Sequence, residues 1–124
     1  MKILIVEDDS TLLSFLTKKL EATGYEVVST HFGDEALSLY RKYSPFVFVL
    51  SDYKFIPGPT IKDGVELVTA IHAINPAQRA SIMTAWCEEA RGKLTEPLQH
   101  LPVLRMPFRI EQLLRLLRQP VLPL

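Results

Sequence analysis

The chain has 124 residues, the length of one ordinary domain whose core folds without disulfide or metal staples. Its 14 Lys and Arg residues balance its 14 Asp and Glu residues, which argues against a strongly basic nucleic-acid surface. The single cysteine, Cys87, excludes an internal disulfide and a cysteine-based zinc site, and we expect it to be a small, partly buried side chain.

The sequence lacks the marks of export and of membrane insertion. The apolar run at 3–6 is too short for a signal peptide and is followed at once by three acids. No stretch reaches the ~18 apolar residues that a membrane span needs. We therefore expect a cytoplasmic protein with no membrane partner and no direct nucleic-acid partner.

The first half of the chain alternates short apolar runs with helical patterns. Residues 3–6 are typical of a strand buried on both faces, and a helix follows that Ser10 can cap and that ends near Gly24. A second strand is predicted over 25–30 and a second helix over 34–43. Two strand–helix units are therefore predicted in this half.

The second half continues the same order. A fully apolar run predicts a strand over 46–50, and two further strands fit residues 80–84 and 102–105. A helix is predicted from Gly64 onward, and leucines at helical spacing predict a last helix over 110–117. Only the stretch between the fourth and fifth strands shows no clear pattern.

Five alternations of strand and helix with short links predict βαβ units with right-handed crossovers. The expected fold class is therefore α/β: a three-layer, doubly wound (βα)5 sandwich around a parallel five-stranded sheet. No repeat or interdomain linker interrupts the pattern, so we expect a single domain over residues 1–124. Sheets of this kind bind ligands at the carboxyl ends of their strands.

Polar residues gather at the predicted strand ends. Glu7, Asp8 and Asp9 follow the first strand, Asp52 follows the third and Thr84 follows the fourth. Parallel strands bring these ends to one edge, where crowded carboxylates either raise a pKa or recruit a cation. Oxygen ligands in a half-open site favour Mg²⁺, beside which Asp52 would act as a nucleophile toward a phosphoryl group.

Each of these features also has a purely structural interpretation. Acids before a helix complement its dipole, and a single Asp after a strand is usually a turn residue. Their joint occurrence at one edge favours the metal and phosphoryl site. The histidines His31, His72 and His100 lie on different predicted elements without ligand spacing, so they receive no metal role.

The ordered motifs of the chain resemble those of response-regulator receiver domains. The resemblance covers essentially the whole chain and rests on Ile3-Leu4-Ile5-Val6-Glu7-Asp8-Asp9, Ser51-Asp52-Tyr53, Asp63-Gly64, Thr84-Ala85 and Met106-Pro107-Phe108. Any one of these motifs is weak, but the set is highly specific. It implies a flavodoxin-like sheet in the strand order 2-1-3-4-5 and one receiver domain without an output domain in this chain.

The resemblance implies a role for each matching position. Asp52 is the phosphoacceptor, and the Mg²⁺ ligands are Glu7, Asp8, Asp52 and the backbone carbonyl of Lys54. Thr84 supplies the hydroxyl that turns toward the phosphoryl group on activation. The donor is a histidine kinase or a phosphotransfer protein. For the face formed by strand five and helix five, the alternatives are a homodimer contact and a plain solvated surface.

Two departures from the family pattern concern the activation switch. Met106 stands where receivers carry a lysine, and a thioether cannot offer that lysine's charge to a phosphoryl oxygen. Val103 stands where receivers often carry an aromatic residue. Arg105 is no simple substitute, because successive strand side chains point to opposite faces. We expect the Lys54 side chain to be the better candidate for charge compensation.

Other segments leave alternatives open. Residues 55–62 lengthen the passage after the phosphoacceptor, either as a tolerated surface insertion or as a segment that contacts a partner or covers the site. Trp86 is expected to pack and not to bind a ligand. The tail at Val121, Leu122 and Leu124 is apolar and would pack back, dimerise or mark where a longer protein was cut.

Three classes of function follow from these observations. The leading one is a phosphoaccepting signalling domain, which is not an enzyme beyond its own phosphorylation and dephosphorylation. The second is a degenerate receiver that binds a partner without phosphorylation, supported by Met106 and Val103. The third, an aspartate-nucleophile phosphohydrolase, is disfavoured because such enzymes carry a second Asp at the position of Lys54.

Overall fold

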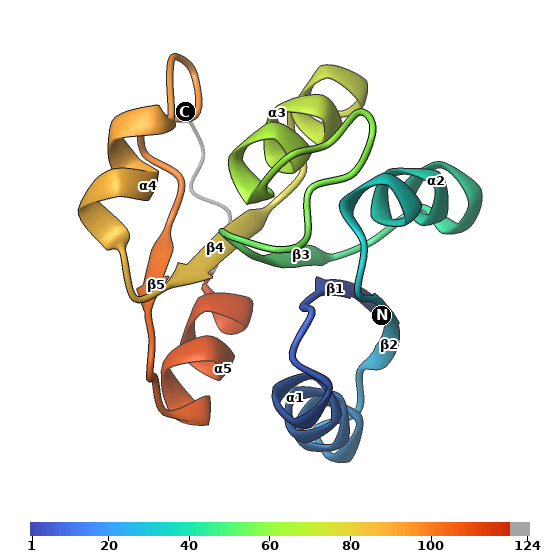
Figure 1. The fold of residues 1–124 in the computed structure, drawn as a ribbon. Helices are drawn as coiled ribbons and strands as arrows, with labels where there is room; N and C mark the ends of the chain where they lie inside the picture. The colour runs from blue at the N-terminus through green and yellow to red at the C-terminus, as the bar shows by residue number, and fades with distance from the viewer. Residues whose placement is uncertain (120–124) are drawn as a thin grey trace.

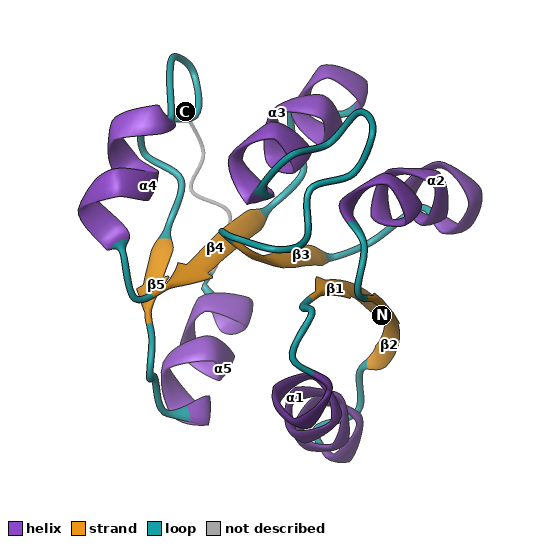
Figure 2. Ribbon diagram, in the orientation of Figure 1, coloured by secondary structure: helices purple, strands orange, loops and turns teal. Residues whose placement is uncertain are grey.

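A computed structural model describes residues 1–119 as five strands and five helices in strict alternation (Figure 1). In chain order they are β1 (Lys2–Val6), α1 (Ser10–Ala22), β2 (Glu26–Thr30), α2 (Gly33–Tyr43), β3 (Phe48–Asp52), α3 (Gly64–Ile74), β4 (Ala80–Thr84), α4 (Cys87–Lys93), β5 (Val103–Arg105) and α5 (Ile110–Arg118). The strands form one parallel sheet in the order β2-β1-β3-β4-β5, which confirms the predicted doubly wound fold (Figure 2). The apolar tail at Val121, Leu122 and Leu124 lies outside the described residues.

The sheet separates two apolar layers, with α1 and α5 on one face and α2, α3 and α4 on the other (Figure 1). Alternate residues of β1 serve the two layers: Leu4 and Val6 pack toward α2 and α3, whereas Ile3 and Ile5 pack toward α1 and α5. Because both faces are buried, the strand appears in the sequence as a continuous apolar run. No helix within residues 1–119 has the length and apolar character to cross a membrane.

The third strand begins and ends two residues later than the apolar run at 46–50 suggests. Phe46 precedes the pairing with β1 and instead stacks on Tyr40 of α2, with ring centroids 5.7 Å apart. At the other end, Asp52 pairs with Met83 of β4. The ladder to β4 therefore carries the strand through Asp52, which is its last residue and not the first residue after it.

The start of α1 differs from the prediction that Ser10 caps it. Asp9 is the cap: its Oδ1 accepts hydrogen bonds from the backbone N–H groups of Thr11 (2.9 Å) and Leu12 (3.1 Å). Ser10 is the first helical residue. A carboxylate at this position satisfies two free N–H groups and also complements the helix dipole. The predicted end of the helix is confirmed, since Gly24 adopts a φ of 100° just after it.

The stretch without a clear sequence pattern contains most of α4. This helix has seven residues, and its buried side chains are the small ones of Cys87 and Ala90. Two small residues on a two-turn helix make too weak a periodicity to detect. Cys87 is buried, as predicted.

The lengthened loop at 55–62 is anchored to the core on the α2 side of the sheet. Phe55 and Ile61 are both buried in the layer that contains α2 and α3. Asp34, in the first turn of α2, accepts a hydrogen bond from the backbone N–H of Ile61 at 2.7 Å. The loop is therefore a packed part of the domain, and a role in contacting partners stays a prediction.

Gly64 fixes how closely α3 approaches the end of β3. Its backbone N–H donates to the carbonyl of Tyr53 at 2.8 Å. A Cβ atom at this position would lie 2.2 Å from the backbone oxygen of Asp52. Because that neighbour is main chain, it can give way only if the end of β3 moves.

We expect Gly64→Ala to destabilise the fold by about 1–3 kcal/mol, the usual range for overpacking a tight site. Gly92→Ala is the matched control, because nothing lies within 4 Å of its missing Cβ; it should be neutral or stabilise α4 by about 0.5–1 kcal/mol. Urea unfolding of the two variants measures both changes. Equal midpoints would contradict the close approach.

Candidate functional site

The acidic residues of the first and third strands meet at one edge of the sheet. Glu7 and Asp8 follow β1, Asp52 ends β3, and these two strands are parallel neighbours. One carboxylate oxygen from each of the three residues lies within 4.8 Å of the others. Within residues 1–119 this is the one such group of His, Cys, Asp or Glu side chains. The structure therefore brings together the three side chains that the sequence placed at this edge.

Glu7 is the most buried of the three acids, with 3% of its surface exposed. Its Oε1 accepts a hydrogen bond from the backbone N–H of Asp9 at 3.0 Å. Its Oε2 is buried and has no hydrogen-bond partner among the described residues. Burial, more than the nearby charges of Asp52 and Asp8, raises the pKa of Glu7 from 4.5 to about 8.

Asp52 is also perturbed, with a pKa raised from 3.8 to about 7. Burial is the largest cause and the charge of Asp8 is the second, while the backbone N–H groups of Tyr53 and Lys54 act in the opposite direction. A buried carboxylate resists ionisation unless positive charge arrives. The cluster of Glu7, Asp8 and Asp52 therefore favours binding of a cation.

The donor atoms fit a hard divalent ion. All three side chains offer carboxylate oxygens, and the Glu7 Oε2 atom is a buried acceptor without a donor. Oxygen ligands of this kind suit Mg²⁺, which usually binds through a few carboxylates and keeps several waters. The residues present therefore match the ion that the sequence motifs imply.

Thr84 is the last residue of β4 and is 2% exposed. Its Oγ1 accepts a hydrogen bond from the backbone N–H of Trp86 at 3.0 Å. A hydroxyl that accepts in this way still has its own hydrogen to donate. The prediction that Trp86 packs is wrong, because 57% of this side chain is exposed. The indole instead lies under the ammonium group of Lys54, 4.8 Å from the ring centroid.

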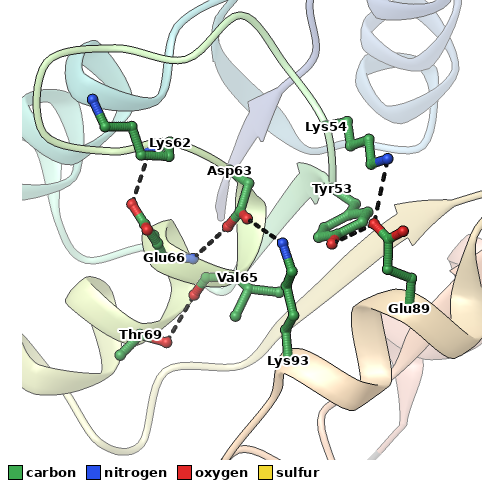
Figure 3. A network of polar contacts seen from close by, with 9 residues as sticks. All are labelled: Tyr53, Lys54, Lys62, Asp63, Val65, Glu66, Thr69, Glu89 and Lys93. Atoms are coloured by element: carbon green, nitrogen blue, oxygen red, sulfur yellow. Dashed lines mark hydrogen bonds and ion pairs between the residues drawn. The ribbon is translucent and has the colours of Figure 1, made fainter.

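The Lys54 side chain contacts α4 in this structure. Its Nζ lies 3.3 Å from Oε2 of Glu89, and the Tyr53 hydroxyl donates to the same oxygen at 2.7 Å (Figure 3). Lys93 of α4 pairs with Asp63 at 3.6 Å. Sequence reasoning missed this network, because neither the strand nor the helix carries a motif for it. The role of Lys54 in charge compensation stays a prediction.

Val103 and Arg105 lie in β5, and Met106 follows it directly. Met106 is half-buried and packs in the layer of α1 and α5. Arg105 points the other way and pairs with Glu88 of α4 at 3.0 Å, as the alternation of strand side chains led us to expect. Val103 packs in the layer of α2, α3 and α4. The position of the family lysine therefore holds an apolar side chain that belongs to the core.

Comparison with known proteins agrees with this geometry. Residues 3–118 match the family model described as the response regulator receiver domain. The response regulator receiver protein CpdR of Brucella abortus (strain 2308) is 33% identical over 114 residues, which are 90% of this chain and 89% of CpdR. A response regulator receiver domain protein from Clostridium thermocellum superposes with a TM-score of 0.82 at 23% identity, over 94% of this chain and 90% of that one.

A second solved structure, the response regulator protein TrrA of Thermotoga maritima, superposes with a TM-score of 0.77 at 23% identity. The match covers 92% of this chain and 93% of TrrA. At this identity the two solved structures establish the fold alone, whereas the family model and CpdR establish the family. The chain belongs to the response regulator receiver domain family, whose members act in two-component signalling.

We expect the ion-free protein to lose stability as the pH rises. Glu7 and Asp52 have pKa values of 4.5 and 3.8 as free groups and about 8 and about 7 when folded. Between these values the folded state binds more protons than the unfolded state, so the free energy of unfolding falls as the pH increases. Urea unfolding in a chelator, from about pH 5 to about pH 8, measures this slope.

Asp52→Asn should flatten that slope, because it removes one titrating group and one charge that acts on Glu7. Glu111→Gln, which changes an exposed acid on α5, is the control and should keep the wild-type slope. Identical slopes for wild type and Asp52→Asn would show that the carboxylate cluster does not hold these protons.

Proposed function

We propose that this receiver accepts a phosphoryl group on Asp52 from a histidine kinase or a phosphotransfer protein, in a Mg²⁺-dependent reaction, and relays the signal by binding a partner. The observation that carries the proposal is the acidic cluster, in which one oxygen each of Glu7, Asp8 and Asp52 lies within 4.8 Å of the others. The unpartnered oxygen of Glu7 adds to it, because a buried acceptor of that kind calls for a donor or a cation.

The reaction uses Asp52 as the nucleophile. A carboxylate oxygen of Asp52 attacks the phosphorus of a phosphohistidine; the new P–O bond forms as the P–N bond breaks, and the imidazole nitrogen leaves with the bonding electron pair. Asp52 must first be ionised, and its pKa of about 7 leaves both forms populated near neutral pH. The proton that Asp52 loses on ionisation passes to solvent, and the imidazole leaves as a neutral ring because its other nitrogen carries a proton.

Mg²⁺ would be held by the carboxylates of Glu7, Asp8 and Asp52 and by the backbone carbonyl of Lys54. When bound, it supplies the positive charge that favours ionised carboxylates and offsets the charge of the transferred group. The solved TrrA structure is a complex with Mg(2+)-BeF, and this likeness supports the same ion for this chain. Thr84 would donate its hydroxyl hydrogen to a phosphoryl oxygen.

The second candidate is a degenerate receiver that binds its partner without phosphorylation. The observation in its favour is Met106, which packs in the apolar layer of α1 and α5 and brings no charge to the acidic cluster. The complete set of three acids favours the first candidate. The two candidates differ in whether the acidic cluster binds a divalent ion and whether Asp52 is modified.

The remaining parts of the proposal concern the setting. The domain would act in the cytoplasm, with no catalytic turnover beyond its own phosphorylation and dephosphorylation. Pairing of two copies through β5 and α5 is part of the proposal, and α5 offers half-buried Leu114 beside exposed Arg115 and Arg118 for it. No direct contact with nucleic acid is proposed, in keeping with a formal net charge of zero.

Labelling with a small phosphodonor tests the proposed function directly. Wild type should become labelled with acetyl phosphate and Mg²⁺, and the label should fall to background in Asp52→Asn and in excess chelator. Asp9→Asn is the matched control: it removes a neighbouring charge, and Asn caps helices as well as Asp. It should therefore keep the label. Unlabelled wild type, beside a well-behaved receiver that labels, would contradict the proposal.

Binding of Mg²⁺ separates the two candidates without any phosphodonor. Trp86 is the single tryptophan, and the hydrogen bond from its backbone N–H to Oγ1 of Thr84 places it at the end of β4. A Mg²⁺ titration should give a saturable change in its fluorescence. Glu7→Gln should weaken the apparent affinity by at least about tenfold, a size that loss of even an indirect metal contact can reach. An absent or unsaturable response in wild type would favour the degenerate receiver.

A further inference from the structure

Glu89 of α4 contacts both of the residues that directly follow the proposed phosphoacceptor Asp52. The hydroxyl of Tyr53 donates to Glu89 Oε2 at 2.7 Å, and Lys54 Nζ lies 3.3 Å from the same oxygen. Figure 3 shows both side chains reaching across to the helix. Tyr53 is fully buried, so its end of the contact is fixed. Lys54 is about half exposed, so its end can move.

The Lys54 ammonium has a second contact just before the start of α4. Its Nζ lies 4.8 Å from the ring centroid of Trp86, the residue just before the helix. A cation over an indole face is attracted by the ring. The carboxylate of Glu89 and the indole of Trp86 therefore hold the amine on α4, although Lys54 lies only two residues after Asp52.

On the basis of the proposed function, we infer that Glu89 is a positioning residue for Lys54: it holds the ammonium group on α4 and releases it when an anion occupies the Asp52 site. The ammonium would then exchange Glu89 for the phosphoryl oxygens. In this way Lys54 would supply the charge that Met106 does not, and α4 would lose one of its links to the phosphoacceptor loop.

The strengths of the two contacts allow this exchange. The side chains of Lys54 and Glu89 are 53% and 48% exposed, and ion pairs with that exposure are weak. A phosphoryl group on Asp52 carries more than one negative charge near neutral pH and offers several acceptor oxygens. Glu89 keeps the Tyr53 hydroxyl as its donor after Lys54 leaves. The departure therefore leaves no buried charge unpaired.

The neighbouring cations have other partners. Lys93 pairs with Asp63 at 3.6 Å, and Arg105 pairs with Glu88 at 3.0 Å. Lys54 differs from both because it leaves the same loop as the phosphoacceptor. Of these three ion pairs, the one between Lys54 and Glu89 would therefore respond most directly to phosphorylation of Asp52.

Binding of BeF₃⁻, a phosphoryl mimic, to the full chain at saturating Mg²⁺ tests the inference, with Trp86 fluorescence and calorimetry as readouts. Glu89→Gln should bind BeF₃⁻ about two- to fivefold more tightly than wild type, the size expected for freeing a weak exposed ion pair. Lys54→Met should bind more weakly than wild type. In the Lys54→Met background, Glu89→Gln should have no further effect.

Two controls separate positioning from general structure. Glu88→Gln removes the adjacent carboxylate of the same helix, which pairs with Arg105, and should leave BeF₃⁻ affinity unchanged. Tyr53→Phe removes the other contact of Glu89 but keeps its charge, so it should not reproduce the effect of Glu89→Gln. Urea unfolding checks that each variant is folded.

The outcomes separate this inference from the proposed function. If wild type binds BeF₃⁻ and Glu89→Gln binds it equally well, or if the effect persists without Lys54, the positioning role is wrong and the phosphoacceptor role stands. If wild type neither binds BeF₃⁻ nor labels with acetyl phosphate, both are wrong.

Discussion

The structure of the site follows from the crowding of three carboxylates, of which Glu7 is buried, Asp52 is partly buried and Asp8 is exposed. Parallel pairing of β1 with β3 places Glu7 and Asp8 beside Asp52, and the core beneath them leaves Glu7 almost no contact with solvent. Burial raises the pKa of Glu7 to about 8 and that of Asp52 to about 7, so protons or a cation must balance the charge. This need for protons or a cation is the main physical constraint on the site.

The distribution of positive charge is the unusual feature of this receiver. Met106 fills space in the apolar layer of α1 and α5 where the family motif has a lysine. The nearest cation along the chain from Asp52 is Lys54, and it lies on α4 against Glu89 and Trp86. An acidic cluster without a fixed cation favours a divalent ion, and by the inference drawn above its response to an anion would depend on Lys54 changing partners.

A polar network joins the residues that follow β3, and the residue before α3, to α4. Tyr53 and Lys54 reach Glu89, while Lys93 reaches Asp63 at the start of α3. The helix α4 is short and buries only two small residues, Cys87 and Ala90, so these polar contacts supplement a small apolar contact. In the inference drawn above, a change of charge at Asp52 would act on α4 through Lys54 and Glu89.

The amino-acid sequence was enough to predict the fold class and the strands of the core, because strands buried on both faces appear as apolar runs. It was also enough to predict the acids at the sheet edge, because these residues directly follow the strands in the chain. It misplaced the cap of α1 and the ends of β3, since a cap depends on which oxygen reaches the free N–H groups and a strand ends where its neighbour does. The exposure of Trp86, and the sharing of Glu89 by Lys54 and Tyr53, emerged only from the packed molecule. Those contacts join residues more than thirty positions apart, and no local pattern encodes the packing that brings α4 beside the residues that follow β3.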